Sequence, residues 1–267
     1  MTGVSDVSML DAVADLARLV GGTALAHFRT ALRTEYKADG SPVTAADRSA
    51  EQVAREWLAR RFPRDGVLGE EFGELRSGAA RRWIVDPIDG TKSFVRGVPL
   101  WGSLVAVCEG SEVLAGAAYF PAIDEMLVAA PGQGCWWNGA RCRVSECADL
   151  GAATVLTTDE RFAGQPDREK HWHTLAARAA LARSWGDCVG YLLVATGRAE
   201  VMVDPVLATW DAAPFLPIVT EAGGVFTDWS GAARIDGGSA IATNRRLAGP
   251  ARVLLECPVD QHLMEMA

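Results

Sequence analysis

Apolar residues recur at helical spacing in two stretches near the start of the chain. In residues 9–28 they stand three or four positions apart, which predicts an amphipathic helix that packs by this stripe. Residues 44–62 repeat the pattern behind Thr44 and Asp47, whose spacing resembles a capping box with Asp in place of Glu. We therefore expect two packed helices in this part of the chain.

Runs rich in β-branched and aromatic residues fill the rest of the first half. Short strands are expected in residues 32–38 and 67–73, and a buried strand begins near Trp83. Further strands follow, separated by short turns such as Asn138-Gly139, which is typical of an antiparallel meander. The meander strands are expected in residues 100–108, 113–120 and 126–136.

Beyond Val144 the pattern changes to an alternation of strands and helices. No tract rich in Pro, Gly or Ser separates the halves, so we expect two tightly packed domains, residues 1–146 and 147–267. Strands are expected in residues 154–158, 199–203, 225–228 and 240–243. Helices are expected in residues 168–183, 189–196, 210–222 and 245–257.

Composition narrows the class of protein. The 267 residues are 49% hydrophobic and 22% charged, as in an ordinary globular protein. The formal charge of −8 and the lack of a Lys/Arg run argue against a nucleic-acid-binding surface. No stretch approaches ~20 uninterrupted apolar residues, and no basic flank with an apolar core marks a secretory signal. We therefore expect no membrane partner and a cytoplasmic location.

The six cysteines and four histidines give no obvious metal site. The cysteines are scattered through apolar surroundings without a C-x-x-C pair, so we interpret them as buried thiols in a reducing compartment. His171 and His173 could bind zinc from a strand, but residues 168–183 are expected to be helical, where this spacing splits the two side chains between faces.

The segment Asp86-Pro87-Ile88-Asp89-Gly90-Thr91 is the most suggestive part of the sequence. Pro87 cannot continue a central strand, so the pairing should break between the two aspartates and both carboxylates can face one side. If Gly90-Thr91 opens a helical turn, its free N–H groups form an anion site nearby. Carboxylates and an anion repel unless a cation lies between them, which favours a Mg²⁺ site that receives a phosphate. The alternative is a turn in which Asp89 is an Asx or N-cap residue.

Other acidic residues have an equally ordinary interpretation when each is taken alone. Asp47 could cap its helix, and Glu70-Glu71 could be a solvated loop. Asp187 and Asp211 stand where helices are expected to begin, which is a common place for a capping carboxylate.

In their order and spacing, these acids resemble the inositol monophosphatase superfamily of Mg²⁺-dependent, lithium-sensitive phosphatases over nearly the whole chain. The motifs are Asp47, Gly69-Glu70-Glu71, Asp86-Pro87-Ile88-Asp89-Gly90-Thr91 and Trp210-Asp211-Ala212-Ala213. Several segments are similar in particular to the branch that acts as histidinol-phosphate phosphatase in histidine biosynthesis. They are residues 37–44, 71–73, 89–99 and 186–188, including Lys92-Ser93-Phe94 where inositol phosphatases usually carry Thr-Asn-Phe.

The resemblance implies a layered αβαβα sandwich, usually a homodimer, with two or three Mg²⁺ ions in each active site. One metal would be held by Glu70, Asp86 and the Ile88 carbonyl, another by Asp86, Asp89 and Asp211, and a weaker third near Glu70 and Asp47. Thr91 and Asp47 would activate the attacking water together with Glu70, and the amides of Gly90 and Thr91 would cradle the phosphate. A single bridging carboxylate is what a close metal pair needs.

The substrate is expected to be a small phosphomonoester. Histidinol phosphate carries an ammonium and an imidazole, and Asp187 and Asp204 are candidates for binding this positive charge. Alternatively, Asp187 caps the following helix and Asp204 pairs with Arg183 or Arg198. The competing substrates are inositol 1-phosphate, 3′-phosphoadenosine 5′-phosphate and a sugar bisphosphate. The competing non-enzyme function is that of a metal-binding regulatory protein.

Overall fold

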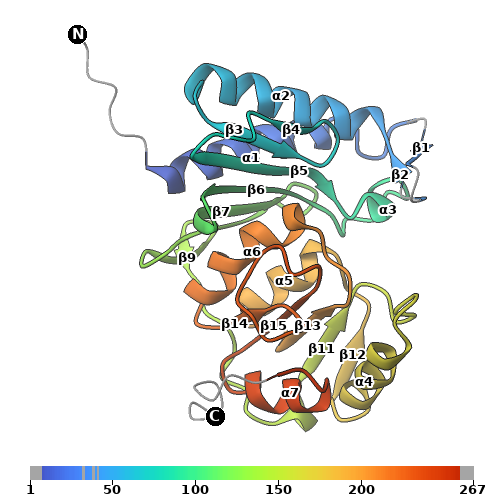
Figure 1. The fold of residues 1–267 in the computed structure, drawn as a ribbon. Helices are drawn as coiled ribbons and strands as arrows, with labels where there is room; N and C mark the ends of the chain where they lie inside the picture. The colour runs from blue at the N-terminus through green and yellow to red at the C-terminus, as the bar shows by residue number, and fades with distance from the viewer. Residues whose placement is uncertain (1–7, 32–33, 38–39, 41, 259–267) are drawn as a thin grey trace.

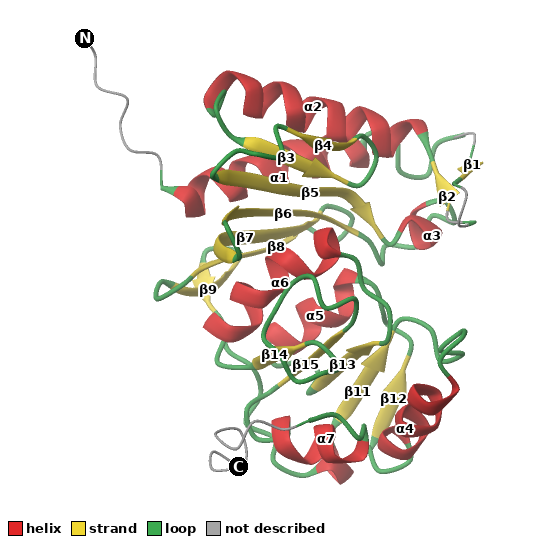
Figure 2. Ribbon diagram, in the orientation of Figure 1, coloured by secondary structure: helices red, strands yellow, loops and turns green. Residues whose placement is uncertain are grey.

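The computed structural model describes residues 8–31, 34–37, 40 and 42–258. Five layers of helix and sheet alternate through the molecule, as Figure 1 shows by position along the chain and Figure 2 by type of element. Two helices, α1 (Met9–Leu25) and α2 (Ala45–Arg61), cover the outer face of the first sheet. The middle layer holds α5 (Cys188–Ala195) and α6 (Thr209–Glu221). Beyond the second sheet lie α4 (Pro166–Ala176) and α7 (Ala248–Leu254). This is the expected αβαβα sandwich.

The first sheet has eight strands in the order β10-β9-β8-β7-β6-β5-β3-β4. Only β3 and β5 pair in parallel, and the remaining neighbours are antiparallel, which confirms the predicted meander. Its strands are β3 (Gly66–Gly69), β4 (Gly73–Leu75), β5 (Arg81–Asp89), β6 (Gly102–Glu109), β7 (Glu112–Phe120), β8 (Glu125–Ala130), β9 (Gly134–Trp137) and β10 (Ala140–Arg141).

Alternate residues of this sheet fill two different cores. Along β6, Leu104 and Ala106 face the middle helices, whereas Val105 and Val107 face α1 and α2. A strand buried on both faces needs apolar residues at every position, which explains why this run lacks the polar alternation of a half-exposed strand.

The second sheet has five strands in the order β12-β11-β13-β15-β14. The strand β11 pairs in parallel with β12 and β13, and β15 pairs antiparallel with β13 and β14. The bounds are β11 (Thr154–Thr157), β12 (Leu181–Arg183), β13 (Val201–Asp204), β14 (Val225–Thr227) and β15 (Ala240–Thr243). The expected boundary at residue 146 falls between the two sheets, in the segment from β10 to β11; the division into two domains itself stays a prediction.

The predicted helix over residues 168–183 is wrong in its second half. Helix α4 ends at Ala176, and Leu181–Arg183 instead forms the edge strand β12, which pairs with β11. The sequence here is rich in Ala and Arg, which favour helices, but pairing with a buried strand outweighs that local preference. His171 lies 3.4 Å from Glu256 and His173 lies 3.8 Å from Glu169, so each histidine faces a carboxylate.

Smaller differences concern the ends of elements. The last helix is shorter than expected, spanning Ala248–Leu254, and the strands β4 and β10 were not predicted. Within the expected strand of residues 32–38, only Glu35–Tyr36 forms a strand (β1), which pairs with β2 (Pro42–Val43); positions 32, 33 and 38 lie outside the described residues. All six cysteine thiols are free. Among the described residues, no helix is long and apolar enough to cross a bilayer.

Candidate active site

The central strand β5 ends in the expected interruption. It pairs with β6 up to Asp86, and the pairing resumes only at Asp89 with a shifted register. Pro87 has no N–H to donate to the neighbouring strand. Its carbonyl oxygen accepts a hydrogen bond from the Ser103 hydroxyl at 2.6 Å. Asp86 Oδ1 accepts the Ile88 N–H at 2.9 Å, which fixes the aspartate against its own turn.

Gly90 joins this strand to the short helix α3 (Thr91–Phe94). Its φ of +86° is strained for residues with a Cβ, and an added Cβ would lie 2.6 Å from the Leu100 carbonyl oxygen. The chain therefore turns sharply enough for Thr91 to begin a helical turn directly behind Asp89, as the sequence predicts. The N–H groups of a first helical turn have no partner within the helix.

Asp86, Asp89 and Asp211 form a cluster that can hold a metal ion. One carboxylate oxygen from each lies within 4.8 Å of the others. Asp211 comes from the first turn of α6, where its Oδ2 also accepts the Ala208 N–H at 3.1 Å. Residues far apart in the sequence thus meet where the first sheet faces the middle helices.

The electrostatics of this cluster fit a cation. Burial, followed by the charges of Glu70 and Asp211, raises the pKa of Asp86, which is 2% exposed. Burial and the charge of Asp211 likewise raise the pKa of Asp89, and burial raises the pKa of Asp211 to about 7. Crowded carboxylates repel one another when they are ionised, which is one reason why their pKa values are raised. A bound cation would relieve this repulsion, and hard oxygen donors are the ligands that Mg²⁺ and Ca²⁺ prefer.

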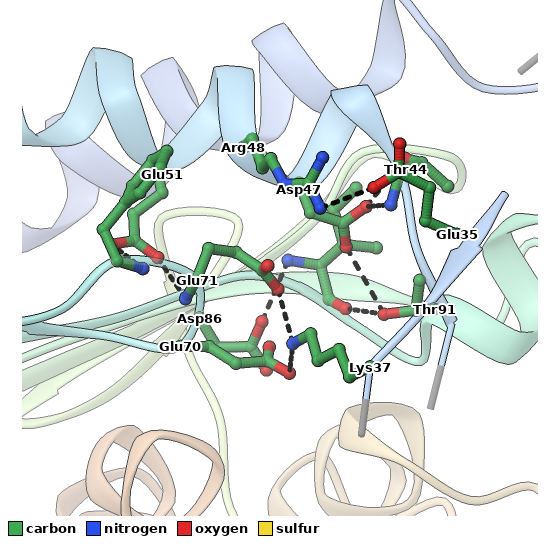
Figure 3. Close-up of polar contacts among 12 residues, drawn as sticks. Glu35, Lys37, Thr44, Asp47, Arg48, Glu51, Glu70, Glu71, Asp86 and Thr91 are labelled. Atoms are coloured by element: carbon green, nitrogen blue, oxygen red, sulfur yellow. Dashed lines mark hydrogen bonds and ion pairs between the residues drawn. The ribbon is translucent and has the colours of Figure 1, made fainter. Parts of the chain in front are cut away.

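Glu70 lies beside this cluster and is paired with a lysine that the sequence did not reveal as a site residue. Lys37 Nζ is 2.7 Å from both Glu70 Oε1 and Glu71 Oε1 (Figure 3). Burial lowers the Lys37 pKa, but the hydrogen bonds and charges of the two glutamates outweigh it and raise the pKa. Lys37 follows β1, which is tied to α2 by an ion pair of 2.8 Å between Glu35 and Arg48.

Glu51, on the buried face of α2, holds the turn that presents Glu70. Its wholly buried carboxylate accepts the N–H group of Glu71 at 2.7 Å (Figure 3). It also accepts the Phe72 N–H at 3.2 Å and Arg55 Nε at 2.8 Å. At Gly69, an added Cβ would lie 2.0 Å from Glu51 Oε1.

The sequence offered one signal for Glu51. It is a charged residue between Ala50 and Ala54 on the buried side of the helix, four positions after Asp47 and so on the same face. Buried carboxylates are rare unless they are paired, so this position could have been recognised as one with a specific partner.

Thr91 and Asp47 are brought together, as predicted. Thr91 Oγ1 lies 3.4 Å from Asp47 Oδ1 and 2.8 Å from the Ile88 carbonyl oxygen. The other oxygen of Asp47 accepts the N–H and the hydroxyl of Thr44 at 2.8 and 2.7 Å, which confirms the predicted capping box (Figure 3). Burial raises the pKa of Asp47 against the lowering effect of the Thr44 hydrogen bonds.

Asp187 lies against the turn after β5. Its Oδ2 is 3.3 Å from where a Cβ on Gly90 would stand, and its N–H donates to Thr158 Oγ1 at 2.8 Å. Although Asp187 precedes α5, its side chain makes no capping hydrogen bond, so the capping alternative is wrong. Burial raises its pKa to about 6, and the charge of Lys92 opposes this.

Asp204 lies deeper than Asp187, with 2% of its surface exposed. Its oxygens accept the Thr158 N–H at 3.3 Å and the Tyr191 hydroxyl at 2.8 Å, and burial raises its pKa to about 6. The expected arginine partners bind elsewhere, Arg183 to the Ala182 carbonyl and Arg198 to Thr196 and Glu125. Asp204 is thus connected to Asp187 through Thr158.

Comparison with known proteins agrees with this geometry. The sequence model of the inositol monophosphatase family matches residues 6–261. The histidinol-phosphatase of Chlorobaculum parvum is 43% identical over 87% of this chain and 91% of that protein. The histidinol-phosphatase of Mycobacterium tuberculosis is 41% identical over 80% of this chain and 84% of that protein.

The fold has close counterparts among solved structures. The extragenic suppressor protein suhB from Bartonella henselae superposes with a TM-score of 0.88, at 28% identity, over 93% of this chain and 98% of that one. The family match over nearly the whole chain shows that this protein belongs to the inositol monophosphatase family and is a phosphatase, a hydrolase of phosphoric monoesters.

Proposed function

We propose that the enzyme hydrolyses L-histidinol phosphate to L-histidinol and phosphate, as a step of histidine biosynthesis. The observation that carries this choice of substrate is Asp187, whose carboxylate lies against Gly90, at the edge of the proposed phosphate site and outside the three-aspartate cluster. An ester bound with its phosphate at this turn would bring its alcohol portion toward that carboxylate. Similarity to two histidinol-phosphatases at 43% and 41% identity supports the same choice.

The charge of Asp187 suits this role. With a pKa of about 6 it is ionised near neutral pH, and it is partly exposed. A charge-assisted hydrogen bond to an ammonium or imidazolium contributes about 1.5–3 kcal/mol. Asp204 is too deeply buried to meet a ligand first, so we propose that it positions Asp187 through Thr158.

We propose that the acidic residues of the site would hold two or three Mg²⁺ ions, of which the Asp86, Asp89 and Asp211 cluster supports one. Asp86 would bridge two of them, one completed by Glu70 and the Ile88 carbonyl and another by Asp89 and Asp211, with the third near Glu70 and Asp47. When bound, the ions would lower the pKa of the attacking water and neutralise charge on the phosphate.

Thr91 and Asp47 would move the proton. The Thr91 hydroxyl donates to the Ile88 carbonyl at 2.8 Å, and a turn of this hydroxyl toward Asp47 Oδ1, 3.4 Å away, opens a path from water to the buried carboxylate. The N–H groups of Gly90 and Thr91 would hold the phosphate oxygens, because they begin a helical turn. Glu70, held by its turn, would complete the group that orients the water.

A substrate screen tests the proposal. Phosphate release should be measured with histidinol phosphate, inositol 1-phosphate, fructose 1,6-bisphosphate and 3′-phosphoadenosine 5′-phosphate. We expect histidinol phosphate to give the highest kcat/KM. A higher value for any other ester would replace histidinol phosphate as the substrate while leaving the phosphatase activity intact.

The Asp187→Asn variant tests the recognition step. It should lower kcat/KM for histidinol phosphate by roughly ten- to a hundredfold, since ~1.4 kcal/mol is a factor of ten. Inositol 1-phosphate, which has no cationic group, is the control in the same variant and should change far less. An equal loss of kcat/KM on both esters would show that Asp187 does not recognise the positive charge of the substrate.

The metal requirement and the assembly are part of the same proposal. Excess EDTA should abolish phosphate release, Mg²⁺ should restore it, and Li⁺ or excess Ca²⁺ should inhibit it, since Ca²⁺ tolerates higher and looser coordination than Mg²⁺. Full turnover in EDTA would exclude the metal mechanism. We also propose a cytoplasmic homodimer, which light scattering coupled to size-exclusion chromatography tests as a doubled mass.

A further inference from the structure

Two of the six thiols face each other at the edge of the first sheet. Cys135 lies in β9 and Cys142 directly follows β10, with their Sγ atoms 3.4 Å apart. The strands pair Arg141 with Trp136, so the next cross-strand pair is Cys142 with Cys135, and the Cys142 N–H donates to the Cys135 carbonyl at 3.1 Å. The two sulfurs are therefore neighbours by strand register and not by a chance rotamer.

This register places the two residues within bonding range. Directly opposed residues of an antiparallel pair have Cα atoms about 4.5–5.5 Å apart, and disulfides span about 4.4–6.8 Å. Closing the bond needs the sulfurs to approach from 3.4 Å to about 2.05 Å, a side-chain movement rather than a backbone one.

We propose that Cys135 and Cys142 form a redox-active dithiol, which a peroxide or a small-molecule disulfide converts into an intramolecular disulfide. With hydrogen peroxide, Cys142 sulfur attacks one oxygen, an S–O bond forms, the O–O bond breaks and water leaves after taking up a proton. Cys135 sulfur then attacks the sulfur of this sulfenic acid, the S–S bond forms and a second water leaves with the thiol proton. Two thiols lose two electrons in total and the peroxide gains them. With a small-molecule disulfide, Cys142 sulfur displaces one thiol of the reagent to form a mixed disulfide, and Cys135 sulfur then displaces the second, so the reagent gains the two electrons.

Cys142 is the sulfur that reacts first. It is 9% exposed, and it follows a two-residue edge strand whose residues are both exposed, whereas Cys135 is wholly buried. The hydrogen bond with Cys135 and the charge of Arg198 lower the Cys142 pKa against burial. By contrast, burial raises the pKa of Cys108 to about 11, so that thiol stays protonated.

The disulfide would tie the sheet edge to the segment that leads to the second sheet. Just beyond Cys142, the Val144 N–H donates to the Ala222 carbonyl at 3.0 Å, after the end of α6. Asp211 stands at the other end of that helix, ten residues before Glu221 and so about 15 Å away. We therefore expect the bond to raise Tm by about 5 °C, as a short closed loop predicts, and to change kcat less than about twofold.

The test is oxidation of the full chain followed by thiol mapping. The purified protein is treated with one equivalent of hydrogen peroxide, or equilibrated with oxidised glutathione, and the remaining thiols are alkylated. Trypsin cleaves after Arg141 and so separates the two cysteines, and the Cys108→Ser chain is used because Cys108 shares a tryptic peptide with Cys135. We expect a Cys135–Cys142 linked peptide that dithiothreitol removes.

Two variants and a matched control complete the test. Cys142→Ser and Cys135→Ser should each abolish the bond, whereas Cys147→Ser, which removes the more exposed neighbouring thiol, should leave it intact. Six alkylatable thiols after oxidation of the natural chain would overturn the proposal, and so would a disulfide mapped to Cys147. Because the linked peptide is sought first in chains that retain both sulfurs, a folding defect of either serine variant would not obscure the result.

Discussion

Replacing Glu51 by glutamine should loosen the turn that carries Glu70 without removing any proposed ligand. The buried carboxylate accepts three hydrogen bonds, from the N–H groups of Glu71 and Phe72 and from Arg55 Nε. A glutamine amide has one oxygen that accepts, while its nitrogen only donates. Whichever way the glutamine amide is oriented, its NH₂ group takes the place of one carboxylate oxygen and faces at least one of these three N–H donors.

The size of the effect follows from that mismatch. A buried donor left without an acceptor costs about 1–3 kcal/mol, and ~1.4 kcal/mol is a factor of ten in an equilibrium constant. Because the lost hydrogen bonds hold the turn directly after Glu70, the apparent dissociation constant for Mg²⁺ should rise roughly tenfold to a hundredfold. At saturating Mg²⁺ the turn is restored, so kcat should change much less.

Isothermal titration calorimetry with Mg²⁺, together with phosphate release as a function of Mg²⁺ concentration, measures this shift. Glu56→Gln is the matched control, because Glu56 lies on the exposed side of the same helix, where it accepts the Gln52 amide at 2.9 Å. Gly69→Ala should reproduce the Glu51→Gln effect, since its Cβ would displace the carboxylate.

If the Glu51→Gln variant binds Mg²⁺ as tightly as the natural chain, Glu51 does not position Glu70. A lower Tm with unchanged metal affinity would show that Glu51 only stabilises the packing of α2 on the sheet. A large loss of kcat that Mg²⁺ does not rescue would likewise contradict a positioning role, because it would place Glu51 in the chemistry itself.

Three further predictions concern the cluster and the proton path. Asp86→Asn should abolish phosphate release with unchanged circular dichroism, because the carboxylate proposed to bridge two metal ions loses its charge. A near-normal kcat would show that Asp86 is only a structural residue of the turn. Thr91→Val and Asp47→Asn should each lower kcat by roughly 10²–10⁴, and the double variant should lose little more, whereas additive losses would mean that Asp47 only caps its helix. Burial raises the pKa of Asp211 to about 7, so the folded state binds more protons than the unfolded state between that pH and the ordinary range near 4. Metal-free protein should therefore gain Tm as pH falls from about 8 to 5, and Mg²⁺ should restore Tm at pH 8; a Tm that falls over this window would contradict the assignment.

The part of the site that could be predicted is the part encoded locally. Pro87 lacks an N–H and Gly90 adopts a positive φ, so the break in β5 and the turn into α3 follow from single residues. The capping box of Thr44 and Asp47 is local in the same sense, and it formed as expected.

Contacts made across the fold could not be derived this way. Lys37 reaches Glu70 from a segment 33 residues earlier, and Glu51 reaches Glu71 from 20 residues earlier. Nothing in the spacing of these residues specifies the partner. The strand β12 was missed for a related reason, since its sequence favours a helix and only its pairing with β11 decides otherwise.

The ordinary and the functional interpretations of these acids turn out to be compatible. Asp47 caps α2 with one oxygen and lies within reach of Thr91 with the other, and Asp211 accepts the Ala208 N–H while its carboxylate joins the cluster. A carboxylate at a helix start is already oriented by backbone N–H groups, so little further ordering is required before it meets a cation or a proton. The cap is therefore part of how the site is built, and in the Mg²⁺-loaded protein substitution of either aspartate should lower both activity and Tm, with the loss of activity the larger effect.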